Sequence, residues 1–313
     1  VFMVILMAFL SPTFLTAKNI VSVLTTESIT GILTVGVMWC ILSKGIDLSP
    51  GALVALTGVV TASLAQKFEY GASRLFPNLP DIPVLVAIVA GLLVGTLFGV
   101  LNGWLIAYTK IPAFIATLGT QLIARALALL YTNAYPIPEL KPGLKNVAQF
   151  ELFNISGASV TVVIVIFVIF AVISGFMLTQ TRFGKSIYAI GGNEECTKLS
   201  GVNVRRYKMM PYIISGVTSA LACLILIGRL NSAQPSMGDK FEMDAIAAVV
   251  VGGTSLSGGS GTMVGTLVGA LIIGVLMNGM NMLGVDSYAQ YIVKGAVILF
   301  AVLLETRKNK NSK

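Results

Sequence analysis

The chain has 313 residues, of which 56% are hydrophobic and only 11% are charged. Soluble domains carry about a quarter charged residues, so a chain this poor in charge cannot cover its surface against water. A net charge of +8 can indicate a nucleic-acid partner, but here the charged residues lie in loops and in the tail, where membrane orientation explains them better. The composition therefore predicts an all-α integral membrane protein that binds no nucleic acid.

Histidine and cysteine usage excludes several kinds of site. The chain has no histidine, which removes histidine-based metal sites and histidine general bases. Its three cysteines, Cys40, Cys196 and Cys223, are scattered and show no CxxC spacing. They fit neither a zinc site nor a disulfide framework, so we expect no bound metal.

Apolar residues fall in blocks long enough to cross a hydrocarbon core of ~30 Å, which takes about 20 helical residues. Helices are expected because each satisfies its own backbone hydrogen bonds in lipid. The first block starts at Val1, so we expect that a short cytoplasmic lead precedes it. We predict ten spans, at residues 1–14, 27–42, 50–66, 84–108, 112–131, 159–178, 211–230, 244–256, 262–283 and 288–304.

Loop charge predicts the orientation of these spans. The loop at 179–210 is strongly basic, and so is the tail with Arg307, Lys308, Lys310 and Lys313. Both should be cytoplasmic by the positive-inside rule, whereas the charge-balanced loops at 67–81 and 132–156 should lie outside. An even number of spans then places both termini in the cytoplasm. This parity requires the short, broken eighth segment to cross.

Two parts of the chain resemble each other, at about 27–131 and 211–304. Glycines recur at every fourth residue in the fourth span and before and within the ninth, and an asparagine follows in each, at Asn102 and Asn278. An acid opens the segment before each, at Asp47 and Asp244. Inverted repeats with broken segments are typical of transporters, so we expect one inverted-repeat domain over 1–313. The alternative is that glycines recur in any packed bundle, because they let helices approach closely.

The basic loop contains a candidate short helix. Asn193 can cap it, Glu194 and Glu195 then lie in its first turn, and Gly201 can end it. Such a helix outside the membrane could dock in a groove of a partner protein. The alternative is an ordinary solvated turn.

Four stretches carry a resemblance to a known family. They are TRFGKSIYAIGGNEECTKLSGVNV at 181–204, GRLNSAQPSMGDKFEMDAIAAVVVGGTSLSGGSGT at 228–262, SKGIDLSPGALVALTG at 43–58 and IPAFIATLGT at 111–120. Together the motifs are specific, and the chain resembles the bacterial ribose- and galactoside-type permeases of ATP-binding-cassette importers over nearly its whole length. The spacing around residues 74–77 and 291–295 favours the galactose/methyl-galactoside branch.

The resemblance implies a coupling helix that touches a separate ATPase subunit, where ATP and Mg bind; this chain itself would bind no cofactor. It departs from the family's Glu-Ala-Ala-x-x-x-Gly pattern at Cys196 and Thr197, and Pro211 lies nearer to Gly201 than in the family. It also implies two copies of the permease and an extracytoplasmic sugar-binding protein, in the bacterial inner membrane. The implied coupling residues are Asn193, Glu194, Glu195, Cys196, Thr197, Lys198, Leu199, Ser200 and Gly201.

A neutral sugar needs a polar lining with little charge. Candidates for the pathway and its broken segments are Asp47, Asn102, Gln121, Asp244 and Asn278. Each has a simpler explanation, since acids cap helices and amides join them. A further polar residue, Arg125, either pairs inside the bundle or extends toward the interface.

Three other classes of protein compete with an importer permease. An ion-coupled secondary sugar transporter usually has buried acids at mid-membrane, whereas these acids lie at span ends. A membrane enzyme would need convergent catalytic groups, which the sequence does not offer. A channel would pass solute without nucleotide. The glycine run at 252–259 lacks the GK[ST] ending of a phosphate loop, so it predicts a tight turn.

Overall fold

A computed structural model describes residues 2–155 and 157–311 of the chain. The expected cytoplasmic lead before Val1, the last residue of the loop at 132–156 and the basic tail residue Lys313 lie outside the described residues. The side chains of Lys308 and Lys310 also lie outside the part described.

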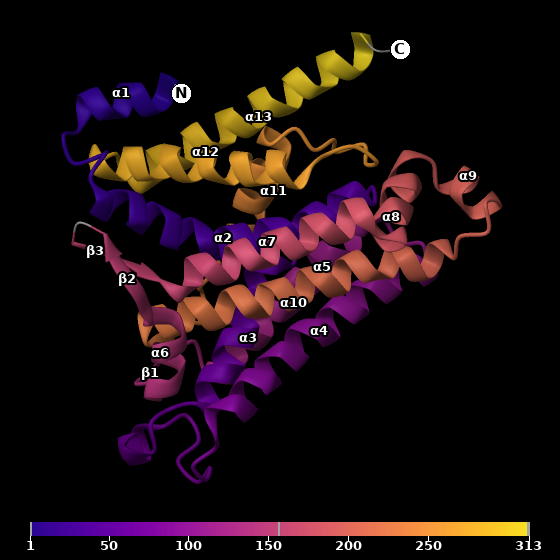
Figure 1. Cartoon of the computed structure of the whole chain (residues 1–313). Coiled ribbons are helices and arrows are strands. Elements are labelled where there is room, and N and C mark those ends of the chain that lie inside the picture. Colours follow the sequence, from indigo (N-terminus) through magenta and orange to yellow (C-terminus); the bar gives the residue numbers. More distant parts are fainter. Residues whose placement is uncertain (1, 156, 312–313) are drawn as a thin grey trace.

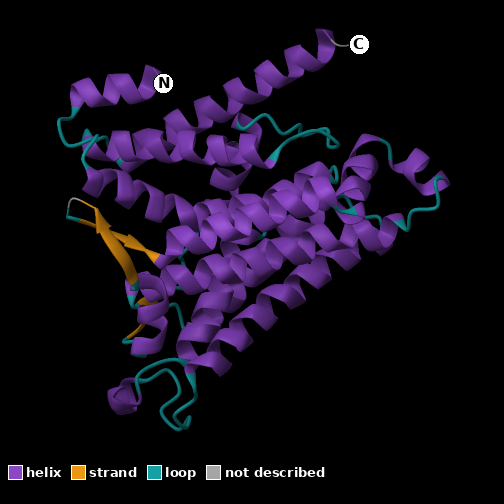
Figure 2. Ribbon diagram, in the orientation of Figure 1, coloured by secondary structure: helices purple, strands orange, loops and turns teal. Residues whose placement is uncertain are grey.

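Helices make up nearly all of the regular structure (Figures 1 and 2). They are α1 (Phe2–Leu10), α2 (Ala17–Leu42), α3 (Pro50–Leu64), the 3-10 helix η1 (Phe68–Ser73), α4 (Val84–Tyr108), α5 (Ala113–Thr132), α6 (Pro142–Gln149), α7 (Val162–Gln180), α8 (Arg182–Gly192), α9 (Glu194–Leu199), α10 (Val204–Leu230), α11 (Phe241–Val251), α12 (Met263–Met282) and α13 (Ser287–Asn311). Within the described residues, four short strands depart from the all-helical expectation, namely β1 (Ile137–Pro138), β2 (Glu151–Ile155), β3 (Ala158–Thr161) and β4 (Ser232–Ala233).

Six helices in the described chain are long and apolar enough to cross a membrane, namely α2, α4, α5, α7, α10 and α12. The apolar part of α13 and all of α3 are shorter. The expectation of a helical membrane protein is confirmed. The full set of ten crossings stays a prediction, because α1 has 9 residues and α11 has 11.

Two expected span starts differ most from the structure. The second span was expected to begin at residue 27, but α2 begins at Ala17, where the Thr16 hydroxyl accepts a hydrogen bond from the Asn19 amide (3.4 Å). Polar side chains in this first part do not end the helix, since hydroxyls such as that of Thr25 donate to the carbonyl four residues earlier. The seventh span was expected to begin at Pro211, but Asn203 caps α10 at Val204 and Pro211 lies inside the helix.

The core lies where α2, α3 and α10 meet. Nearly all of α3 is buried, as is α2 from Ser28 onward. Helix α10 packs closely on α4 because glycines line the contact: a Cβ at Gly95 would lie 2.5 Å from the Gly216 carbonyl oxygen. Helix α2 from Ser28 onward and the middle of α10 are therefore largely buried within the chain.

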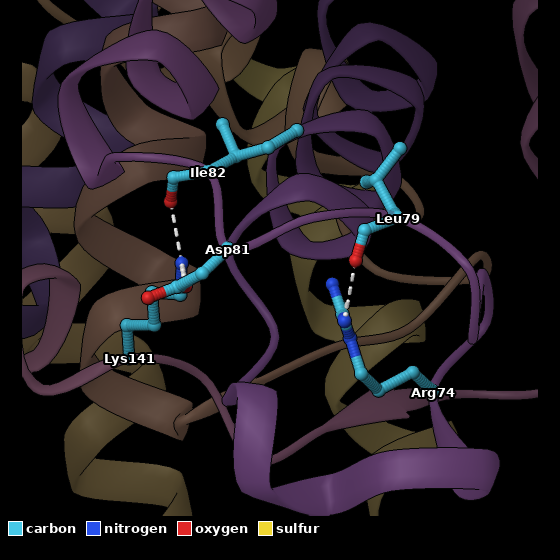
Figure 3. Close-up of polar contacts among 5 residues, drawn as sticks. All are labelled: Arg74, Leu79, Asp81, Ile82 and Lys141. Carbon is cyan, nitrogen blue, oxygen red and sulfur yellow. Dashed lines mark hydrogen bonds and ion pairs between the residues drawn. The ribbon is translucent and has the colours of Figure 1, made fainter.

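The molecule has two distinct ends. Helices α8 and α9 project from one end, hereafter the α9 end, and the strands gather at the other, the strand end (Figures 1 and 2). At the strand end β1 pairs with β4 and β2 pairs with β3, both antiparallel. Arg74 donates to the Leu79 carbonyl (2.8 Å), and Lys141 contacts Asp81 and the Ile82 carbonyl, which fixes the loop before α4 (Figure 3).

Candidate functional site

The segment between α2 and α3 is a break in the helical bundle. It turns at Lys44, whose φ is 63°, and then runs without helix to Ser49. The buried Asp47 carboxylate accepts hydrogen bonds from the Ser49 amide (2.9 Å) and the Ser49 hydroxyl (2.7 Å). Asp47 therefore stabilises the backbone just before α3, as its position ahead of that helix predicted.

Two neighbouring helices fix this broken segment from the side. From α4, the Asn102 amide donates to the Ser49 hydroxyl (2.9 Å) and accepts from Thr120 of α5 (2.6 Å). Thr117 of α5 donates to the Ile46 carbonyl (3.1 Å) and accepts from the Leu48 amide (3.2 Å). Two predicted site residues, Asp47 and Asn102, thus share one network. All the side chains of this network are buried, so the network is suited to fixing the backbone of the broken segment.

A second polar cluster joins α3, α5 and α11. Gln121 donates to the carboxylate of the buried Glu242 (3.2 Å). Arg125 donates to the carbonyls of Pro235 (3.0 Å), Met237 (2.7 Å) and Gly51 (3.3 Å). Arg125 therefore pairs inside the bundle.

Sequence reasoning missed Glu242. The available signal was an acid two residues before Asp244, at the start of an apolar segment. An acid next to lipid is costly, so it marks a buried partner or a pathway.

Asp244 and Asn278 lie apart from the broken segment. Asp244 forms an ion pair with Lys294 of α13 (2.5 Å) and lines a cavity of about 30 Å³ with Glu27, Thr30 and Thr34. Asn278 forms two amide hydrogen bonds with Asn19 of α2 (3.1 and 3.0 Å). Asp244 lies in the first turn of α11, which begins at Phe241, so an acid opens this segment as expected, and its carboxylate also pairs across to another helix.

The α9 end has the local structure that the sequence predicted. The Asn193 side chain accepts from the Cys196 amide (3.0 Å), and Gly201 has a φ of +82° after the helix. An ion pair between Glu194 and Lys208 (2.7 Å) holds α9 to the start of α10. Leu199 is 87% exposed. A hollow of about 430 Å³ lies between α8 and α9, lined by Lys185, Ser186, Ala189, Asn193, Cys196, Thr197, Ser200 and Val202.

The glycine run at 252–259 forms turns, as expected. Gly253, Gly258 and Gly259 have positive φ, which suits glycine. The Gly259 amide donates to the Leu42 carbonyl at the end of α2 (3.0 Å), and a Cβ at Gly191 of α8 would lie 2.4 Å from the Gly259 nitrogen. These turns therefore pack between α8 and the end of α2, where the broken segment begins.

Comparison with known proteins decides the family. A model of the branched-chain amino acid transport system / permease component family matches residues 19–302. The chain belongs to this permease family. It is a component of a transport system and not an enzyme, and its membrane-spanning helices agree with that role. No solved structure matches the chain.

Curated relatives match this permease over nearly its whole length. It is 44% identical to the ribose import permease protein RbsC of Escherichia coli K12, over 96% of this chain and 89% of the relative. It is 43% identical to RbsC of Bacillus subtilis, over 98% and 90% of the two chains. The galactose/methyl galactoside import permease protein MglC of E. coli K12 is 40% identical, over 97% and 91%. The expected resemblance to both groups is confirmed, whereas the preference for the galactoside branch is not.

Proposed function

We propose that the chain is the membrane-spanning permease subunit of an ATP-binding-cassette importer that carries a monosaccharide across the bacterial inner membrane. The main support for this proposal is the identity of 40–44% to ribose and galactoside import permeases over nearly the whole chain. The substrate class is a ribose- or galactose-like sugar. Alternating access of the bundle moves the sugar.

A separate ATPase subunit binds ATP and Mg and contacts the permease through residues 193–201. The geometry of α9 supports this assignment, because its capped helix projects from the bundle with Leu199 exposed and a hollow beside it. Its ion pair to Lys208 connects it to α10, which continues into the core. Motion of α9 would therefore reach the centre of the bundle.

The α9 end faces the cytoplasm, both termini lie there, and α11 completes ten crossings. The helices repeat as an inverted pair, α2 to α5 and α10 to α13. Contacts support this pairing: α10 contacts α2, α3 and α4, and α2 contacts α10, α11 and α12 in the matching places. Likewise α3 contacts α4 and α5, while α11 contacts α12 and α13.

Three further partners belong to the proposal. An extracytoplasmic sugar-binding protein docks at the strand end, a second copy of the permease completes the pathway, and lipid covers the remaining apolar helix faces. The strand end suits docking because its loops are fixed by ion pairs such as Lys67–Glu139 (2.6 Å).

The test is sugar uptake by vesicles that contain the permease together with a partner ATPase and a sugar-binding protein. We expect uptake of ribose or galactose that requires ATP. Replacing Glu195 by Arg should abolish uptake and its coupling to ATP hydrolysis, because a basic side chain would disturb the docking surface of α9. The matched control is Glu195→Gln, which keeps the size of the side chain without adding a basic group and should leave coupling intact. Proton-driven uptake without the ATPase would instead favour a secondary transporter.

A further inference from the structure

Residues 234–240 lead from the strand end to α11 without forming a helix. The preceding strand β4 pairs with β1 at the strand end, and the segment then leads to α11. At the start of α11, Glu242 accepts a hydrogen bond from Gln121, which lies near the middle of the spanning helix α5. The segment therefore passes through about half of the hydrocarbon thickness as turns.

Irregular backbone at this depth is tolerated only where protein buries it or water reaches it. Arg125 satisfies two of its carbonyls, those of Pro235 and Met237. However, the side chains of Gln234, Ser236 and Asp239 are exposed in the single chain. Polar side chains facing lipid would be costly, so this face of the molecule does not face lipid.

Behind this segment lies a buried carboxylate, that of Glu242, which can accept a further hydrogen bond. Glu242 is 3% exposed, and its second oxygen has no hydrogen-bond partner among the described residues. That oxygen lies against Gly51 in the first turn of α3, where a Cβ would lie only 2.1 Å away. Two residues earlier in the chain, the Lys240 ammonium lies 3.7 Å from the centre of the Tyr291 ring of α13.

We propose that Gln121, Arg125 and the segment 234–240 form a wall of the sugar pathway in the outer half of the membrane. The ligand is a neutral polyhydroxylated molecule, and the inference rests on the proposed function. Hydroxyl groups both donate and accept, and the wall offers the Asp239 carboxylate as acceptor and the Arg125 guanidinium as donor. Glu242 acts as a positioning residue, because it holds Gln121 and packs on α3.

The first experiment measures water access in the assembled transporter. Cys196→Ala removes the exposed cysteine, while Cys40 and Cys223 are buried. In this background Asp239→Cys is treated with a charged, membrane-impermeant methanethiosulfonate. The matched control is Leu97→Cys near the middle of α4, where the leucine is 64% exposed. We expect Asp239→Cys to react at least about tenfold faster than the control, because the thiolate forms only in water.

The second experiment measures sugar transport. Asp239→Asn should lower ATP-dependent uptake of ribose or galactose about tenfold, the factor expected for one hydrogen bond to a charged group, and Asp239→Glu should restore part of it. The ATPase rate of the complex should stay unchanged.

Two results would overturn the inference while wild-type uptake remains ATP-dependent. They are labelling no faster than at Leu97→Cys and normal uptake by Asp239→Asn. Failure of wild-type uptake would instead refute the proposed function.

Discussion

Two asparagines that occupy similar places in the sequence differ in their surroundings. Asn102 is completely buried and joins α4 to Ser49 and Thr120, whereas Asn278 is half-buried and contacts Asn19. The sequence could show that both follow a glycine-rich helical face. It could not show the partners, because these come from distant parts of the chain.

Replacing Asn102 by Leu should therefore lower the free energy of unfolding by about 1–3 kcal/mol, since it removes two buried hydrogen bonds, those to Ser49 and Thr120. Replacing Asn278 by Leu should cost only about 0.6 kcal/mol, the usual size of a hydrogen bond between membrane helices. Unfolding in detergent, followed by circular dichroism, measures both. Equal losses would contradict this prediction, because they would show that the two amides contribute equally to the free energy of unfolding.

At the scale of elements, the contact between α4 and α10 depends on missing side chains. The spacing of Gly91, Gly95, Gly99 and Gly103 predicted a face of α4 for close packing, and the structure has this face against α3 and α10. The partner glycine on α10, Gly216, is not part of a run of glycines at every fourth residue, so the sequence did not predict its contact with α4. A Cβ there would lie 2.2 Å from the Gly95 carbonyl oxygen.

Gly216→Val should separate these two helices and cost at least about 1–3 kcal/mol of stability, the range for overpacked cores. Gly119→Val in α5 is the control, because a Cβ at Gly119 has open space within 4 Å. The midpoint of thermal unfolding of the purified permease should fall for the first variant and stay nearly constant for the second. A similar fall in both would mean that valine weakens these helices wherever it stands.

For the whole molecule, the orientation in the membrane can be tested with a natural thiol. Cys196 is exposed on α9, while Cys40 and Cys223 are buried. A membrane-impermeant maleimide should label Cys196 in inside-out vesicles and leave right-side-out vesicles unlabelled, because the positive-inside rule places the α9 end in the cytoplasm. The variant Glu151→Cys at the strand end, with Cys196 replaced by Ala, should give the reverse pattern. Labelling of Cys196 from outside would contradict the proposed contact with an ATPase.

The sequence alone determined the membrane class, the bounds of α4, the cap at Asn193 and the turn at Gly201. These features depend on composition, hydrophobic blocks and neighbouring residues. The tertiary structure decided which polar groups meet: Asp47 with Asn102 through Ser49, Asp244 with Lys294, and Glu242 with Gln121. It also decided where α2 and α10 begin. The physical reason is that a buried polar group must find a partner in three dimensions, and that partner can lie more than a hundred residues away.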